Sequence, residues 1–170
     1  MSHNIEIKAR IFNMEEMLIR VAALAEHGPI EIDQDDTFFS CLNGRLKLRI
    51  LSSNEGQLIF YRRPDKSGPK ESFYVIHSTT SPDSMREVLS LAYGQAGRVK
   101  KHRTLFMKGR TRIHLDRVEG LGDFLELEVV LDEGEQPQAA TAEADELLKR
   151  LGISSEQLVK GAYADMHFHF

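Results

Sequence analysis

The chain has little of what marks several large classes of protein. Its 170 residues include a single cysteine, Cys41, which excludes an internal disulfide framework and leaves a cysteine-rich zinc module without ligands. No apolar run approaches the length needed to cross a membrane, and the first residues contain no apolar signal region. No internal repeat or low-complexity tract stands out. We therefore expect a cytoplasmic protein in a reducing compartment, with no membrane partner.

The chain also lacks a strong overall charge. The formal net charge is −4 at pH 7, which does not favour a nucleic-acid partner or an anionic membrane surface. Lysine and arginine nevertheless cluster in particular segments, so a small net charge is compatible with strongly positive local regions. A chain of this length with 41% apolar residues can bury a sizeable core. We expect residues 1–170 to form a single domain.

Charged and aliphatic residues alternate in segment after segment, which predicts β-strands with two different faces. In residues 45–50, RLKLRI, three cations alternate with three aliphatic residues. Residues 112–116 and 124–129 show the same alternation on either side of a turn at residues 119–122. Asn43-Gly44 is the strongest two-residue turn signal in the chain and predicts a hairpin over residues 37–51.

The helix and strand signals together predict an α+β fold. One helix is expected from Asn13 to a stop at Gly28-Pro29, a second from Ser81 to Gly94, and two more over residues 139–151 and from Ser154 onward. About eight strands are joined mostly by tight turns, and parallel pairing would need crossover helices between most of them. We therefore expect an eight-stranded antiparallel β-barrel, or tunnel, with the helices packed outside.

The charged faces of these strands have two possible orientations. If they face outward, the charges form a solvated exterior, which is common for strands of this kind. Two observations favour the inward orientation. Four amphipathic helices need an apolar surface to pack on, and the outer wall of the barrel supplies one. Cations also dominate some strands and carboxylates concentrate at the end of another, whereas solubility alone would mix the two signs.

An inward orientation gives a lumen rich in cations, which requires an anionic ligand. The inward cations would be Lys8, Arg10, Arg45, Lys47, Arg49, Lys101, Arg103 and Arg112. The inward carboxylates would be Glu6, Asp116, Glu126 and Glu128. Arginine binds phosphate oxygens in pairs, while the carboxylates would repel a polyanion unless a divalent cation lay between them. The residues thus indicate a polyphosphate site that contains Mg²⁺ or Mn²⁺.

Seven short motifs, taken in order and spacing, resemble the CYTH superfamily, also called the triphosphate tunnel metalloenzymes. They are NIEIKAR at 4–10, GRLKLR at 44–49, YRRPD at 61–65, GPKES at 68–72, VKKHR at 99–103, RIHLD at 112–116 and FLELE at 124–128. The resemblance implies an eight-stranded antiparallel tunnel that binds a triphosphate with magnesium or manganese. Within the superfamily, HLDRVEGLGDFLELE at 114–128 is most similar to the class IV adenylyl cyclases.

The resemblance also implies roles for individual residues. It implies catalytic roles for Glu6, Lys8, Lys101 and Glu128. It implies metal binding by Glu6, Asp116, Glu126 and Glu128. It implies phosphate binding by Arg45, Lys47, Arg63, Lys70, Arg103 and Arg112. One position departs from the pattern, because Asn4 stands where a glutamate is usual and an uncharged amide weakens a second metal site.

An enzyme acting on ATP or tripolyphosphate is implied, and three functions stay open. In a cyclase, the ribose 3′-hydroxyl of ATP attacks the α-phosphorus and releases pyrophosphate. In a hydrolase, water attacks the terminal phosphorus of an inorganic, nucleoside or thiamine triphosphate. A polyphosphate or nucleotide binder without catalysis is the third, and Asn4 is its main support. A homodimer is compatible with the sequence.

A few other side chains have candidate roles near the tunnel. A cyclase needs an adenine pocket, for which the candidates are Phe38, Phe39, Ser72 and Tyr74. For His114 we expect a structural hydrogen bond in preference to proton transfer. Tyr163 and Asp165 either fold over one mouth of the tunnel or pack in the ordinary way.

Overall fold

The computed structural model describes residues 2–167 of the chain. Its strands are β1 (Ser2–Ile11), β2 (His27–Phe39), β3 (Arg45–Ser52), β4 (Glu55–Arg62), β5 (Lys70–Thr79), β6 (Gln95–Lys108), β7 (Thr111–Val118), β8 (Gly122–Val130) and β9 (Leu158–Val159). Its helices are α1 (Met14–Leu24), α2 (Pro82–Tyr93), α3 (Pro137–Leu151) and α4 (Tyr163–His167), with a 3₁₀ turn at Ser155–Gln157. Within the described residues, none of the helices is both long and apolar enough to span a membrane.

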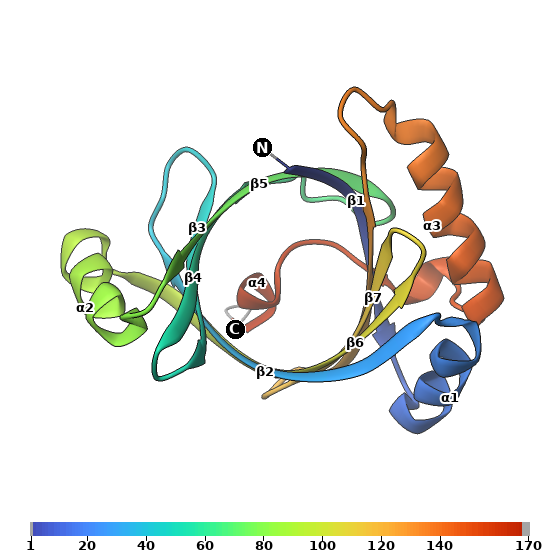
Figure 1. Cartoon of the computed structure of the whole chain (residues 1–170), viewed down its shortest axis with the longest axis horizontal. Coiled ribbons are helices and arrows are strands. Elements are labelled where there is room, and N and C mark those ends of the chain that lie inside the picture. Colours follow the sequence, from blue (N-terminus) through green and yellow to red (C-terminus); the bar gives the residue numbers. More distant parts are fainter. Residues whose placement is uncertain (1, 168–170) are drawn as a thin grey trace.

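The first eight strands form a closed antiparallel barrel (Figure 1). Their order is β5-β4-β3-β2-β6-β7-β8-β1, and the barrel closes because β1 also pairs with β5, with Asn4 opposite Ser72 and Glu6 opposite Lys70. The two-residue strand β9 pairs with β1 as an addition to the sheet. The expected α+β class, an eight-stranded antiparallel barrel with helices outside it, is confirmed.

The main apolar core lies outside the barrel, between its wall and two helices. Figure 1 shows α1 and α3 on one side of the barrel and α2 on the other. Ile7 of β1 and Leu127 of β8 are buried with Val21 of α1 and Leu148 of α3. Each large aliphatic side chain contributes about 1.5–3 kcal/mol when it is fully buried. This outer layer stabilises the barrel and leaves the inner faces of the strands for polar groups.

A second, smaller apolar cluster lies at one end of the barrel. The helix α4 is drawn within the outline of the barrel in Figure 1, and its Tyr163 packs in this cluster with Phe38 and Phe124. The rings of Tyr163 and Phe124 are 4.9 Å apart. On the same helix, Asp165 accepts a 2.8 Å hydrogen bond from Arg45. Tyr163 therefore packs in the ordinary way, within this cluster, and the short helix that carries it and Asp165 lies within the outline of the barrel.

Three local predictions were wrong. α1 begins after its Asn13 cap as expected, but it ends at Leu24, and Gly28-Pro29 lies inside β2. β2 therefore starts well before residue 37, and because Phe39 pairs with Leu46 the link to β3 is longer than a two-residue turn. The segment from Ser154 is a 3₁₀ turn, a short strand and a short helix. Gly161, at φ +81°, redirects the chain between β9 and α4, a conformation that glycine adopts without strain.

Candidate functional site

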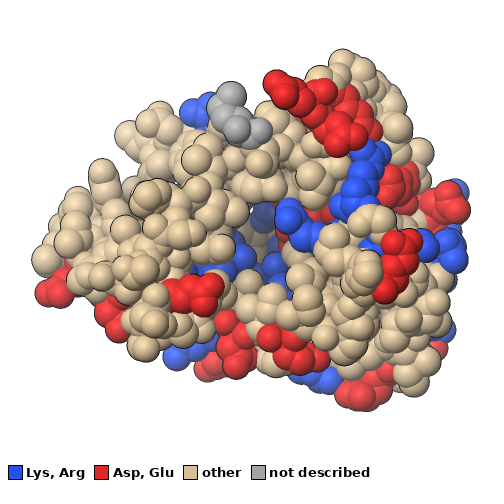
Figure 2. Space-filling view, viewed as in Figure 1, with Lys and Arg blue, Asp and Glu red and all other residues tan. Residues whose placement is uncertain are grey.

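The lumen of the barrel contains a cavity of about 300 Å³, at the lower end of the size range of small-molecule sites. Figure 2 shows Lys and Arg side chains inside this hollow. The cations that line it are Lys8, Lys47, Arg49, Arg63, Lys101, Arg103 and Arg112. The carboxylates that line it are Glu6, Asp36, Glu126 and Glu128. The alternation along each strand places these charges inside and the aliphatic residues outside.

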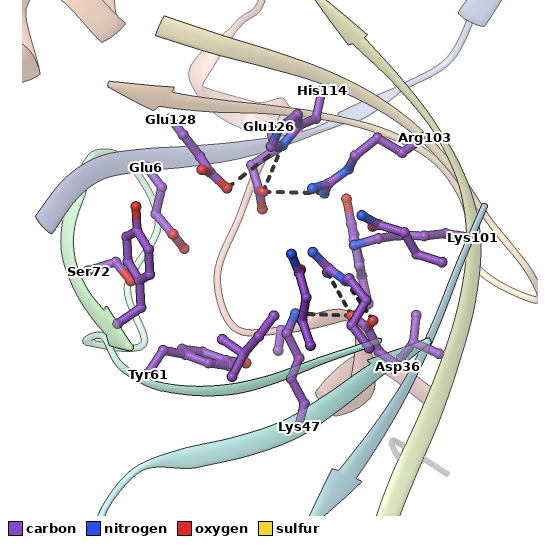
Figure 3. A pocket seen from close by; sticks show the side chains of 18 of the residues that line it. Glu6, Asp36, Lys47, Tyr61, Ser72, Lys101, Arg103, His114, Glu126 and Glu128 are labelled. Atoms are coloured by element: carbon purple, nitrogen blue, oxygen red, sulfur yellow. Dashed lines mark hydrogen bonds and ion pairs between the residues drawn. The ribbon is translucent and has the colours of Figure 1, made fainter. Parts of the chain in front are cut away.

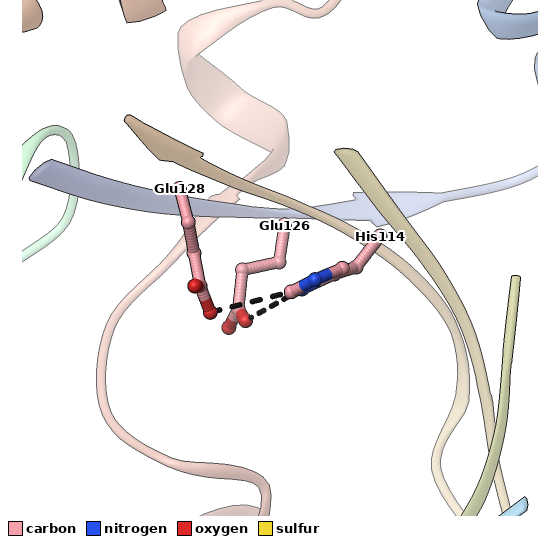
Figure 4. A group of neighbouring side chains, drawn as sticks. All are labelled: His114, Glu126 and Glu128. Carbon is pink, nitrogen blue, oxygen red and sulfur yellow. Dashed lines mark hydrogen bonds and ion pairs between the residues drawn. The ribbon is translucent and has the colours of Figure 1, made fainter. Parts of the chain in front are cut away.

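Two carboxylates and a histidine meet on one part of the wall (Figure 4). Glu126 and Glu128 follow one another on the inner face of β8, and His114 of β7 lies directly opposite Glu126. His114 Nδ1 is 3.3 Å from Glu126 Oε1 and 3.7 Å from Glu128 Oε1. One ligand atom from each of the three lies within 4.8 Å of the others. Carboxylate oxygens and an imidazole nitrogen at this spacing can hold a divalent cation.

The neighbouring strand β1 adds Glu6 and Lys8 to this wall. Glu6 is opposite Glu128 and Lys8 is opposite Glu126 in the β1–β8 pairing, and Figure 3 shows Glu6 pointing into the cavity with both β8 carboxylates. Lys8 Nζ lies 3.4 Å from Glu126 Oε2, and Glu6 pairs with Arg63. Burial raises the pKa of Glu6 although Arg63 opposes the change, and burial lowers the pKa of Lys8.

Two buried aspartates hold the cations on the other strands. Asp116 accepts from Arg103 Nε at 2.7 Å and from its second nitrogen at 2.8 Å. Asp36 accepts two bonds of 2.8 Å from Arg49 and one of 3.0 Å from Lys47. Paired bonds of this kind fix the direction of a guanidinium group. The cationic side chains are therefore oriented before any ligand arrives.

Burial and neighbouring charges shift the titration of this cationic part of the wall. Burial alone would raise the pKa of Asp36, but Arg49 and Lys47 hold it well below its usual value. Burial, together with Arg49, lowers the pKa of Lys47 to about 8. Burial, together with Arg103, holds the pKa of Lys101 well below its usual value. These amines are easier to deprotonate than lysines in water.

Three of the predicted site residues lie outside the cavity lining. Asp116 is fully buried behind Arg103, and it also accepts a 2.8 Å bond from the Tyr163 hydroxyl. Lys70 is buried and donates to the carbonyl of Lys66 at 3.0 Å. Arg45, bound to Asp165, lies at the end of the barrel that α4 covers. The predicted residues that the cavity brings together are Glu6, Lys8, Lys47, Arg63, Lys101, Arg103, Arg112, Glu126 and Glu128.

Some of the other side chains expected near the tunnel line the cavity, and others lie outside it. Of the adenine candidates, Phe38, Ser72 and Tyr74 line the cavity, while Phe39 is buried outside its lining. Arg10, placed in the inward set by its strand, packs its guanidinium 4.8 Å from the Phe124 ring and donates to the Leu121 carbonyl.

Asp36 and Gln34, which β2 contributes to the cavity, were not among the residues expected there. A signal existed, because Ile32, Gln34, Asp36 and Phe38 recur at the period of a strand. It was obscured by acidic residues such as Asp35 on the opposite face of the same strand.

Asn4, where the sequence departs from the expected glutamate, also lines the cavity. Its side chain is almost fully buried, and its amide nitrogen donates to Glu128 Oε2 at 3.4 Å. Its amide oxygen is buried, and no hydrogen-bond partner for it occurs in the part of the chain that the structure describes. The neutral amide thus lies beside the carboxylate cluster without adding to its charge.

Comparison with known proteins agrees with this geometry. The family model described as the CYTH domain matches residues 2–163. The chain is 26% identical over 169 residues to the adenylate cyclase CyaB of Aeromonas hydrophila, covering 94% of this chain and 85% of that protein. It is 25% identical to a Methanocaldococcus jannaschii protein provisionally named adenylate cyclase, covering 95% and 97%. A solved structure from Pyrococcus horikoshii, 24% identical and covering 95% and 98%, has the same fold, with a TM-score of 0.84.

Proposed function

The chain belongs to the CYTH domain family, and from this premise we propose that it converts ATP to cyclic AMP and pyrophosphate, as class IV adenylyl cyclases do. The observation that carries the proposal is one closed lumen in which seven cations face a buried cluster of carboxylates. The Aeromonas relative, which matches nearly the whole chain, bears the name of this activity.

The charge balance of the lumen supports a polyanionic substrate with a metal. The seven lining cations exceed the four lining carboxylates and Asp116 by two charges. A divalent cation at the carboxylates would raise this surplus to four positive charges. Buried charges of one sign need compensation, and the phosphate chain of ATP supplies it in a form that arginine binds well.

The residues on the wall fit a divalent cation. Glu126, Glu128 and His114 offer donor atoms close together, and Glu6 reaches the same space from β1. When bound, such an ion supplies positive charge that stabilises phosphate oxygens and lowers the pKa of a nearby hydroxyl. In this assignment Glu6, Glu126 and Glu128 hold the ion, whereas Asp116 holds Arg103.

The side chains of the protein would bind the phosphates and accept the proton of the attacking hydroxyl. Arg103 and Arg63 bind the β- and γ-phosphates and stabilise the charge of the departing pyrophosphate. As the ribose 3′-oxygen bonds to the α-phosphorus, the bond from that phosphorus to the bridging oxygen breaks. The hydroxyl proton needs an acceptor in the lumen. Lys8 or Lys101, uncharged before the transfer, is suited to accept it because the pKa of each is lowered, and the charge surplus given above applies once that proton is bound.

The nucleoside would lie against the apolar part of the wall. Phe38 and Tyr74 offer ring surfaces to a base, and Ser72 offers a hydroxyl close to Asn4 on the adjoining strand. An enzyme that forms a cyclic product must hold the sugar against the α-phosphate, so these contacts decide whether cyclisation or hydrolysis occurs.

Hydrolysis of the terminal phosphate of a triphosphate is the second candidate, and the cation-rich lumen supports it, while Asn4 bears on the number of metal ions in either reaction. A neutral amide in place of a carboxylate lowers the negative charge beside Glu128 and weakens any second metal position. Attack by water on the terminal phosphorus needs the cations of the lumen but no site for a sugar. Both reactions would use Arg63, Arg103 and the carboxylate cluster.

One product analysis separates these functions. The protein is incubated with ATP or tripolyphosphate in Mg²⁺ or Mn²⁺, phosphorus NMR follows phosphate and pyrophosphate, and mass spectrometry detects cyclic AMP. We expect cyclic AMP and pyrophosphate in equal amounts. Arg103→Ala should abolish turnover, whereas Arg98→Ala, on the outer face of the same strand, should retain it. Phosphate without cyclic AMP would favour the hydrolase, and tight binding without any product would indicate a binder that is not an enzyme.

A further inference from the structure

We infer that His114 is a direct ligand of the metal, which makes the site a mixed nitrogen-and-oxygen site that prefers first-row transition ions such as Mn²⁺ over Mg²⁺. The inference rests on the proposed function for the presence of a metal. It goes further by assigning a nitrogen donor and an order of metal affinity, neither of which follows from the carboxylates.

The position of His114 is set by the sheet. β7 and β8 are paired so that His114 is opposite Glu126, next to the pair of Arg112 and Glu128. Its side chain is 5% exposed, and Figure 4 shows the ring directed toward the two carboxylates. The ring nitrogen therefore faces the place where the carboxylates converge, away from bulk water.

The distances also fit a shared ion, because Nδ1 makes only a long hydrogen bond to Glu126 and has Glu128 within reach as well. A good N–H···O bond is about 2.9–3.0 Å long, whereas Nδ1 lies 3.3 Å from Glu126 and 3.7 Å from Glu128. Two neighbouring ligands of an octahedral ion, each about 2.1–2.2 Å from it, are about 3 Å apart. Small movements of three side chains would bring the donor atoms to that spacing.

A second observation at the same place is compatible with a bound ion. The buried amide oxygen of Asn4 has no partner among the described residues, although its amide nitrogen reaches Glu128. A buried polar atom is normally hydrogen-bonded. A cation beside Glu128, or a water molecule on that cation, would satisfy this oxygen.

The donor set determines which ion binds. Mg²⁺ takes oxygen ligands and loses its water molecules reluctantly, so an imidazole adds little to its affinity. First-row transition ions accept nitrogen ligands more readily. His114 is thus the residue that should discriminate Mn²⁺ from Mg²⁺, while Glu126 and Glu128 bind both ions.

Electron paramagnetic resonance of Mn²⁺ tests this without an activity assay. Mn²⁺ is titrated into the full chain with and without tripolyphosphate, and pulsed spectra are examined for coupling to a nitrogen nucleus. We expect one tightly bound Mn²⁺ with nitrogen coupling that changes on labelling histidine with ¹⁵N. In His114→Gln the coupling should disappear, and the ratio of Mn²⁺ to Mg²⁺ affinity should fall by about tenfold or more. The control His77→Gln, an exposed residue of β5, should behave as the wild type.

Each contrary result has a distinct meaning. The wild-type spectrum and its isotope shift need no variant, so a folding defect in His114→Gln cannot hide the answer. Bound Mn²⁺ without nitrogen coupling would overturn the inference and leave the proposed function intact. His102 lies on the outer surface of β6, where it bonds to Asp33 and Glu31. Coupling that survives in His114→Gln but not in His102→Gln would place the ion at that surface and overturn the inference too. Absence of any bound Mn²⁺, with or without tripolyphosphate, would contradict both the inference and the metal-dependent function.

Discussion

Replacement of Asp36 by asparagine should separate the stability of the protein from its affinity for a triphosphate. Asp36 is 2% exposed and accepts three bonds from Arg49 and Lys47. Without its charge, two buried cations lose their counter-ion. Removing one partner of a buried ion pair costs about 3–5 kcal/mol. That is a large part of the roughly 5–15 kcal/mol free energy of unfolding of a typical domain.

A triphosphate in the lumen would replace the missing negative charge. The variant should therefore regain part of its lost free energy of unfolding when tripolyphosphate is added, and by linkage it should bind that ligand more tightly than the wild type. A recovery of about 1.4 kcal/mol corresponds to a tenfold gain in affinity. Urea unfolding with and without tripolyphosphate and titration calorimetry measure the two quantities.

The neighbouring residue provides a matched control. Asp35 lies on the opposite face of β2, where it pairs with Arg98 near the surface. Asp35 also pairs with Arg86 and is only partly exposed, but pairs near the surface contribute about 0–1 kcal/mol each, so Asp35→Asn should cost less stability than Asp36→Asn and leave the affinity unchanged. A contrary result would be that Asp36→Asn binds tripolyphosphate more weakly than the wild type and is also less stable. Asp36 would then serve to orient Arg49 and Lys47 for the ligand, and the reasoning that the ligand replaces its charge would be refuted.

Three further predictions concern the same lumen. Burial lowers the pKa of Lys47 to about 8, so the affinity for tripolyphosphate should fall as pH rises through 8 and Lys47 loses its charge, and calorimetry should show a weaker pH dependence in Lys47→Arg. Glu128→Gln should lower turnover by roughly a hundredfold in the product assay, with the circular dichroism spectrum unchanged. Tyr163→Phe removes the 2.8 Å bond to Asp116 and should cost about 1 kcal/mol in urea unfolding, while a cost near zero would show that ring packing alone holds α4.

Much of the fold could be predicted because three strands alternate strictly. Over residues 45–50, 112–116 and 125–129 the inner residues are charged or histidine and the outer ones are aliphatic, so the direction of the charges follows from the need of the helices for an apolar surface. β2 could not be predicted in full, because Asp33 and Asp35 place acids on its outer face as well. The prediction missed Asp36 for the same reason.

The site could be predicted in its residue types but not in its pairings. Arg63 lies just beyond the end of β4, so only the family resemblance drew attention to it. The local sequence did not indicate that Asp116 would bind Arg103 and Tyr163 and be buried by them instead of lining the cavity. That arrangement depends on where α4 packs, and α4 is a single short helix with no periodic signal of its own.

The central claim is that a phosphate chain and a divalent cation bind inside this barrel. A crystal structure grown with Mn²⁺ and a non-hydrolysable ATP analogue, with anomalous data at the manganese edge, tests it most directly. The account predicts a manganese peak at Glu126 and Glu128, with phosphate oxygens on Arg63 and Arg103. Manganese and nucleotide bound only on the outer surface, with the lumen cations still paired to Asp36 and Asp116, would contradict it.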